Sequence, residues 1–293
     1  MRTLHTGSVG VVGGGIMGSG IAEVTARAGF DVVVREVDEA SSEAARYRLT
    51  TSLARAVRSG KVTDPERDAT LARLSFTCDL GDLAGCDVVV EAVVEDEPAK
   101  LAIFRALGGI VSPQCLLASN TSSIPIMKLA AATEHPQRVI GMHFFNPAPV
   151  LPLVEIVPSL LTSAETVERA MAFAGGQLGK STVLSKDRAG FVVNALLIPY
   201  LLAAVRMVES GFASAEDVDT AMVAGCAHPM GPLSLADLIG LDTTHAVADS
   251  MYAEFKEPLY APPPLLLRMV EAGLLGRKSG RGFFSYDGSR AAA

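Results

Sequence analysis

A short glycine-rich segment between residues 13 and 18 constrains the fold of this chain more than any other feature. Gly13, Gly15 and Gly18 form the pattern G-x-G-x-x-G. The pattern follows an apolar run and precedes a stretch in which apolar residues recur at spacings of four, three and four, as on one face of a helix. In that context the first glycine permits a tight turn, the second lets the backbone approach a pyrophosphate, and the third lets helix and strand pack closely. The segment therefore predicts a dinucleotide-binding turn at a helix N-terminus.

An acidic residue, Glu36, stands at the end of the second predicted strand, residues 32–35. At about twenty residues after the glycines, a carboxylate accepts hydrogen bonds from an adenosine ribose. Arg35 could balance this charge, point to the other face of the strand or hold a 2′-phosphate, so the pattern favours NAD and leaves NADP open. An ordinary turn beside a solvated surface acid is disfavoured, because strand, loop, helix and acid occur in register. The predicted cofactor contacts here are Gly13, Gly15, Ile16, Met17, Gly18 and Glu36.

The first half of the chain alternates short apolar runs with longer amphipathic segments, as in a parallel sheet covered by helices on both faces. Besides residues 9–12 and 32–35, strands are predicted at residues 88–92, 116–119, 139–143, 153–157 and 182–184, with a helix at residues 97–110. After about residue 186 helical runs replace strands, at residues 191–210, 215–226 and 265–272. The predicted fold class is α/β, a Rossmann-type doubly wound sheet over residues 1–187 followed by an all-helical C-terminal domain over residues 188–293.

Composition narrows the possible partners and the cellular compartment. The formal net charge of −7 offers neither nucleic acid nor an anionic membrane any attraction. The four cysteines lack C-x-x-C spacing and histidine neighbours, so we expect no metal site, no disulfide framework and a reduced cytoplasmic location. No signal-peptide core is apparent. The most apolar run, residues 191–205, contains Asn194 and Pro199 and is too short to span a membrane, which predicts a buried helix.

One of the five histidines, His143, is the candidate proton-transfer group. It ends a predicted strand, and Glu155 lies in the next strand after a proline-rich turn. Neighbouring strands joined in this way can bring a carboxylate beside an imidazole, fixing its tautomer and stabilising the imidazolium. Oxidation of an alcohol by hydride transfer needs such a base, and a histidine with a pKa of about 6.5 serves both directions. From the spacing alone, a surface role for Glu155 is an equal alternative.

Several blocks of sequence resemble the 3-hydroxyacyl-CoA dehydrogenase family, closest to its short bacterial members that act on 3-hydroxybutyryl-CoA. The resemblance covers nearly the whole chain, and several blocks in order are far more specific than one. The blocks are GGGIMGSG at residues 13–20, EAVVE at 91–95, SNTSS at 119–123, HFFNPAP at 143–149, GFVVN at 190–194, HPMG at 228–231, GLDT at 240–243 and GRKSGRGF at 276–283.

The resemblance implies a role for individual residues. It implies that His143 is the catalytic histidine, that Glu155 is its partner, and that Ser122 and Asn194 hydrogen-bond the substrate near the reacting carbon. Glu36 takes the place of the usual aspartate, which is one carbon shorter. The remaining residues implied to line the cofactor pocket are Glu95, Lys100, Ser122, Asn146 and Lys278.

The resemblance also implies that the CoA portion binds near a helical hairpin over residues 39–74, where Ser52 matches a contact position. Arg55, Arg58 and Lys61 are basic residues at helical spacing nearby. They could meet the CoA phosphates, or they could form an ordinary solvated helix face.

The activity implied is reversible oxidation of a short-chain (S)-3-hydroxyacyl-CoA to the 3-oxoacyl-CoA with NAD. The same chemistry on a hydroxyacyl group carried by an acyl carrier protein is an alternative, as is a non-catalytic NAD-binding protein. The second of these is disfavoured because all four residues implied in catalysis are present. We also expect a homodimer formed by the helical domain, since its helices are too apolar to be covered within about a hundred residues.

Overall fold

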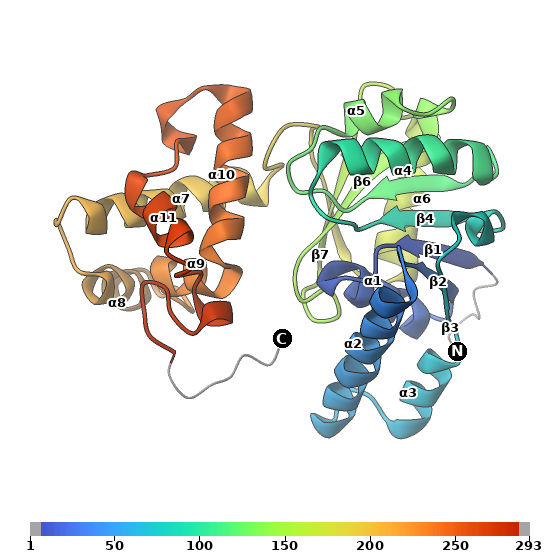
Figure 1. Cartoon of the computed structure of the whole chain (residues 1–293), viewed down its shortest axis with the longest axis horizontal. Helices are drawn as coiled ribbons and strands as arrows, with labels where there is room; N and C mark the ends of the chain where they lie inside the picture. The colour runs from blue at the N-terminus through green and yellow to red at the C-terminus, as the bar shows by residue number, and fades with distance from the viewer. Residues whose placement is uncertain (1–6, 287–293) are drawn as a thin grey trace. The chain divides into compact units, whose positions relative to one another are not determined.

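The computed structural model describes residues 7–286. Its chain divides into two compact units, Met1–Asp187 and Arg188–Ala293 (Figure 1). The first unit contains a sheet with its covering helices, and the second is helical. The predicted fold class, a Rossmann-type α/β domain followed by an all-helical domain, is confirmed.

The first unit is built on an eight-stranded sheet with the strand order β3-β2-β1-β4-β5-β6-β7-β8. Every neighbouring pair is parallel except β6 and β7, which are antiparallel. The strands are β1 (Ser8–Val12), β2 (Asp31–Arg35), β3 (Leu74–Thr77), β4 (Val88–Glu91), β5 (Leu116–Ser119), β6 (Val139–Phe144), β7 (Leu153–Pro158) and β8 (Ser181–Leu184). All seven predicted strands are confirmed. The edge strand β3 was missed, because four residues, three half buried and one exposed, give too short a pattern to recognise.

Helices cover both faces of the sheet because strand side chains alternate between them. Val9 and Val11 pack with Ile21 and Ala22 of a helix on one side, whereas Gly10 between them faces Leu83 on the other. The helices of this unit are α1 (Ile16–Arg27), α2 (Glu39–Arg58), α3 (Asp64–Leu71), α4 (Glu97–Ile110), α5 (Ile126–Ala131) and α6 (Ala164–Met171). The parallel strands end at one edge of the sheet, which is where ligands bind in such folds.

The second unit packs its helices around a core that includes Leu201, Leu233 and Met251. Its helices are α7 (Val193–Glu209), α8 (Ala215–Cys226), α9 (Pro232–Ile239), α10 (Leu241–Phe255) and α11 (Pro264–Glu271). The predicted helices correspond to α7, α8 and α11. Sequence reasoning missed α9 and α10, which are separated only by Gly240 at a φ of 105°. Within residues 7–286, no helix has the length and apolar content needed to cross a membrane.

Candidate active site

The two residues predicted to act together, His143 and Glu155, lie directly opposite each other on β6 and β7. The distance from His143 Nδ1 to Glu155 Oε2 is 2.7 Å. Glu155 is fully buried and His143 is 7% exposed. Since an ionised carboxylate only accepts hydrogen bonds, Nδ1 is the protonated ring nitrogen in the neutral imidazole. The structure therefore favours a paired role for Glu155 over the surface role that the spacing left open.

The backbone beside His143 is fixed by Asn120, which follows β5. The Phe144 N–H donates to Asn120 Oδ1 at 2.8 Å, at the end of β6. The ring centroid of Phe145 lies 4.5 Å from that of His143. Packing and hydrogen bonding on both sides limit the rotation of the imidazole. The contribution of Asn120 was missed in the sequence, although it lies inside one of the blocks that resemble the family.

The glycine-rich turn has a geometry that suits a pyrophosphate. Gly13 has a φ of 93°, and a Cβ there would lie 2.8 Å from the Ala92 carbonyl oxygen. A Cβ on Gly18 would collide with the Gly13 carbonyl, whereas one on Gly15 would meet nothing within 4 Å. Gly15 is also the N-cap of α1 and supplies no side-chain cap. The first turn of α1 therefore presents N–H groups to open space, where a dinucleotide phosphate fits.

The acidic residue Glu36 contacts this turn directly. Its Oε1 accepts from the Gly14 N–H at 2.6 Å, and its Oε2 accepts from the Val37 N–H at 3.2 Å. Arg48 of α2 donates to the Gly14 carbonyl oxygen at 3.0 Å. The carboxylate is thereby fixed beside the phosphate-binding turn, at the end of β2. Sequence reasoning missed Arg48, because a contact across 34 residues leaves no local signal.

Arg35 precedes Glu36 and stays half buried. Among the described residues its Nε is buried without a hydrogen-bond partner. In the described structure, Glu36 has no ion pair with Arg35 or any other cation within 4 Å. The carboxylate of Glu36 therefore faces the turn with its charge uncompensated by Arg35.

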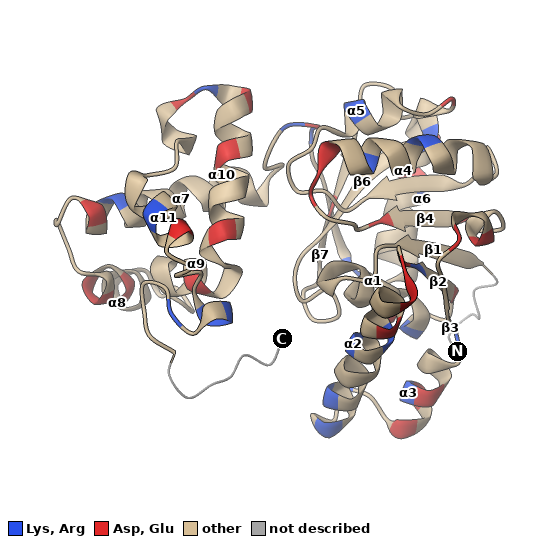
Figure 2. Cartoon of the chain, viewed as in Figure 1, with Lys and Arg blue, Asp and Glu red and all other residues tan. Residues whose placement is uncertain are grey.

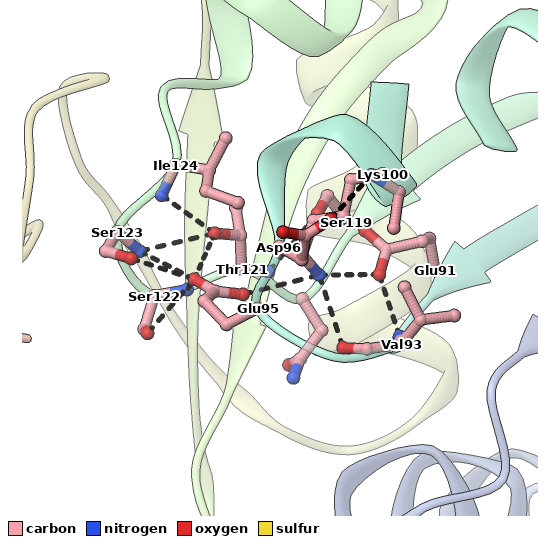
Figure 3. Close-up of polar contacts among 12 residues, drawn as sticks. Glu91, Val93, Glu95, Asp96, Lys100, Ser119, Thr121, Ser122, Ser123 and Ile124 are labelled. Carbon is pink, nitrogen blue, oxygen red and sulfur yellow. Dashed lines mark hydrogen bonds and ion pairs between the residues drawn. The ribbon is translucent and has the colours of Figure 1, made fainter. Parts of the chain in front are cut away.

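Glu95 holds the loop that carries Ser122 (Figure 3). Its Oε1 accepts from Thr121 Oγ1 at 2.5 Å, from Ser122 N at 2.9 Å and from Ser123 N at 3.2 Å. Burial would raise the pKa of Glu95, but the Lys100 ammonium and the hydrogen bonds from the loop hold it below its usual value. Glu95 is therefore ionised near neutral pH.

Lys100 is buried beside two carboxylates. It is 1% exposed, and its Nζ lies 2.6 Å from Glu91 Oε1 and 3.3 Å from Glu95 Oε2 (Figure 3). Glu91, at the end of β4, is fully buried. Lys100 thus lies between two carboxylates, Glu95, which was predicted, and Glu91, which was not.

The other predicted residues are distributed over both units. Asn146 is exposed in the loop after β6, and Ser52 is half buried on α2. Asn194, in the first turn of α7, and Lys278, paired with Asp242, belong to the second unit. The structure therefore places most predicted residues of the first unit at or just after strand ends, whereas Ser52 lies on α2 and Lys100 on α4.

The basic residues near Ser52 lie at the carboxyl end of α2. Arg55 and Arg58 occupy its last turn, where cations stabilise the helix dipole (Figure 2). Both side chains and that of Lys61 are exposed. An exposed cation at a helix C-terminus fits the solvated face and the phosphate contact equally well.

Comparison with known proteins matches two family models to the chain. The 3-hydroxyacyl-CoA dehydrogenase NAD binding domain matches residues 8–188, and the 3-hydroxyacyl-CoA dehydrogenase C-terminal domain matches residues 190–286. The chain is similar to the 3-hydroxybutyryl-CoA dehydrogenase of Mycobacterium tuberculosis (strain CDC 1551 / Oshkosh), with 63% identity over 95% of this chain and 98% of that protein.

Two solved structures are similar over most of their length. One is M. tuberculosis FadB2, with 63% identity and a TM-score of 0.94, covering 95% of this chain and 98% of that one. The other is (S)-3-hydroxybutyryl-CoA dehydrogenase from Ralstonia eutropha, with 44% identity and a TM-score of 0.90, covering 96% of this chain and 99% of that one.

Proposed function

The chain belongs to the 3-hydroxyacyl-CoA dehydrogenase family, and on that premise we propose that it interconverts (S)-3-hydroxybutyryl-CoA and acetoacetyl-CoA with NAD as cofactor. The observation that carries this proposal is the buried pair of His143 and Glu155, joined at 2.7 Å on adjacent strands. A buried imidazole held by a carboxylate is the proton acceptor that oxidation of a secondary alcohol requires.

In the oxidation, His143 Nε2 accepts the proton of the 3-hydroxyl group. Glu155 holds the Nδ1–H side of the ring and stabilises the imidazolium that forms. NAD, when bound, supplies the acceptor for the hydride. In the reduction, the imidazolium of His143 returns the proton to the oxygen of the 3-oxo group. One histidine thus serves as base and as acid, as the reversibility of the reaction demands.

Ser122 is proposed to hydrogen-bond the substrate near the reacting carbon, and Asn194 to do the same from the second unit. Glu95 supports the first of these roles, because it fixes the backbone of the loop that carries Ser122. The residues proposed to hold NAD are Gly13, Gly15, Ile16, Met17, Gly18, Glu36, Glu95, Lys100, Ser122, Asn146 and Lys278. Ser52 is proposed to contact the CoA portion.

The test of this function is acetoacetyl-CoA-dependent loss of NADH absorbance with the purified chain. We expect turnover with the CoA thioester and much weaker turnover with the same acyl group on an acyl carrier protein. Preference for the carrier-protein thioester would change the assigned substrate and keep the chemistry. NADH binding without turnover of either thioester would contradict the proposed activity.

We predict at least about a hundredfold preference for NADH over NADPH in kcat/KM, set by Glu36. A 2′-phosphate beside this carboxylate would meet a fixed like charge, costing several kcal/mol, and each 1.4 kcal/mol corresponds to a factor of ten. Glu36→Ala should weaken NADH binding and reduce the ratio of kcat/KM for NADH to that for NADPH, because Arg35 can then bind the 2′-phosphate of NADPH.

The matched control is Glu39→Ala, which removes an exposed acid at the first residue of α2. It should leave the cofactor ratio unchanged. If the wild type uses both cofactors equally, or if Glu36→Ala leaves the ratio as it was, Glu36 does not discriminate between them.

The second unit is proposed to form a homodimer. Apolar side chains on α7 are exposed at helical spacing, at Leu196 (74%), Ala203 and Met207, and Val223 of α8 is exposed as well. Apolar surface of this kind is normally covered by a partner, and a second copy gives a closed two-fold assembly.

We predict a mass by light scattering of twice the chain mass of 30.6 kDa at micromolar concentration. Leu196→Glu should shift the population toward monomer, because it places a charge in the buried interface. Leu160→Glu, at a 94% exposed position of the first unit, is the control and should remain dimeric. A monomeric wild type would rule the dimer out.

We propose a reducing compartment, the cytoplasm, for this chain. All four cysteines are free thiols. Disulfides form and persist in oxidising compartments, and buried unpaired cysteines are common in the cytosol. Fractionation of the native cells would test this location.

A further inference from the structure

We propose that Glu91 is a positioning residue that sets the place of Ser122 through Lys100 and Glu95, an inference that rests on the proposed contact between Ser122 and the substrate. Glu91 is the last residue of β4 and lies beside Val12 of β1, where the glycine-rich turn begins. It is the first residue of the EAVVE block, and the reaction as derived above gives it no task.

Glu91 is a buried carboxylate with all its hydrogen bonds made inside the protein. Its Oε1 accepts from Lys100 Nζ at 2.6 Å and from Val93 N at 2.8 Å. Its Oε2 accepts from Ser119 Oγ at 2.7 Å. These donors come from β5, from α4 and from the turn after β4 (Figure 3). A carboxylate held from three directions is a rigid anchor.

Lys100 connects Glu91 to Glu95. Its ammonium is 1% exposed and lies between two carboxylates, Glu91 at 2.6 Å and Glu95 at 3.3 Å. A buried ammonium is stable only when it is paired, so the charge of Glu91 holds the Lys100 ammonium in place. Without Glu91, the nearest carboxylate to Lys100 is that of Glu95. The attraction between them then draws the Glu95 carboxylate away from the loop.

The position of Glu95 sets the conformation of the loop that carries Ser122. A single oxygen, Oε1, accepts from Thr121 Oγ1, Ser122 N and Ser123 N. The Ser122 hydroxyl lies 3.4 Å from the same oxygen. Any shift of the Glu95 carboxylate therefore shifts the Ser122 backbone and hydroxyl together. Misplacement of a substrate contact by about 1 Å costs on the order of 10²-fold in rate.

The test compares Glu91→Gln with Glu23→Gln, a matched change of another buried glutamate in the same unit. Glu23 is 1% exposed on α1 and makes its ion pair with Arg27, outside the chain of contacts from Glu91. Glu91→Gln should lower kcat by roughly 10- to 100-fold, because it displaces the Glu95 carboxylate and with it Ser122. Glu23→Gln should keep the wild-type kcat.

Hydrogen exchange supplies a readout that does not depend on activity. The amides of Ser122 and Ser123 donate to Glu95 Oε1, and the amide of Ile124 donates to Thr121 Oγ1 within the loop. They should exchange at least about tenfold faster in Glu91→Gln than in the wild type or in Glu23→Gln, because opening of the loop becomes easier. If the wild type fails to reduce acetoacetyl-CoA, the proposed function falls, and the exchange rates still decide whether Glu91 holds the loop.

The double variant Glu91→Gln with Lys100→Met separates the effect of Glu91 on the position of Ser122 from its effect on the stability of the fold. Glu91→Gln alone leaves a poorly paired buried ammonium and should lower the Tm by about 10 °C. The double variant removes that charge and should recover most of the Tm while kcat stays low. Recovery of kcat together with the Tm would show a purely structural role and overturn the proposal.

A second comparison tests whether Glu91 acts on kcat through Ser122. In a Ser122→Ala background, Glu91→Gln should lower kcat by less than about threefold, since the contact that it positions is already gone. An undiminished loss in that background, or wild-type loop exchange in Glu91→Gln, would each overturn the assignment.

Discussion

Replacing His143 with glutamine is expected to lower kcat by roughly 10² to 10⁴-fold, the usual contribution of a positioned acid or base. Glutamine keeps a polar side chain of similar length and cannot exchange a proton near neutral pH. The fold and the Kd of NADH should change little, because His143 lies on β6 while the glycine-rich turn lies between β1 and α1. Steady-state kinetics in both directions, NADH titration and thermal unfolding provide the measurements.

The matched control is His135→Gln, in the same unit. His135 precedes a short turn and makes no side-chain cap there. Its replacement should leave kcat at the wild-type value. A His143→Gln enzyme with near-wild-type kcat would remove His143 from the mechanism.

Replacing Glu155 with glutamine is expected to lower kcat by up to roughly 10⁴-fold, the loss seen when the acid behind a catalytic histidine is neutralised. The amide has nearly the same shape as the carboxylate. It can present an N–H to Nδ1 and so favour the wrong tautomer, and it cannot stabilise the imidazolium. Because Glu155 is fully buried, the measurement has to include the Tm, so that loss of folded enzyme is not counted as loss of rate.

The double variant of His143→Gln and Glu155→Gln tests whether the two residues form a unit. Its kcat should be little lower than that of the worse single variant, since the task of Glu155 is to orient and charge-stabilise the ring of His143. Multiplication of the two single effects would mean that each residue acts by itself. The 2.7 Å contact between them favours the first outcome.

The fold could be predicted from the sequence where the local patterns were long or had a specific turn. The central strands β4 and β5 are buried on both faces, so they appear as short continuous apolar runs. The edge strand β3 and the helices α9 and α10 were not predicted. For the two helices, the break is a single glycine, which the periodicity of the flanking residues does not reveal.

Site residues could be predicted from the sequence only where they lie in or beside a recognisable motif. The spacing of His143 and Glu155 left two interpretations, and the register of β6 and β7 favours the paired one because it places the residues opposite each other. Lys100 was predicted from the resemblance to line the cofactor pocket, and its burial against Glu91 depends on packing between α4 and β4. Contacts of that kind are fixed by three-dimensional packing and have no signature in a single sequence.

The antiparallel pairing of β6 with β7 makes enzymatic activity a reporter of correct strand alignment. Side chains alternate between the faces of a sheet, so a slip of one residue would turn Glu155 into the apolar layer that holds Val154 and Ile156. The same slip would set an aliphatic side chain opposite His143. A molecule with misaligned strands would therefore be inactive as well as poorly packed. The count of active sites in a refolded sample consequently measures how many molecules have aligned these two strands correctly.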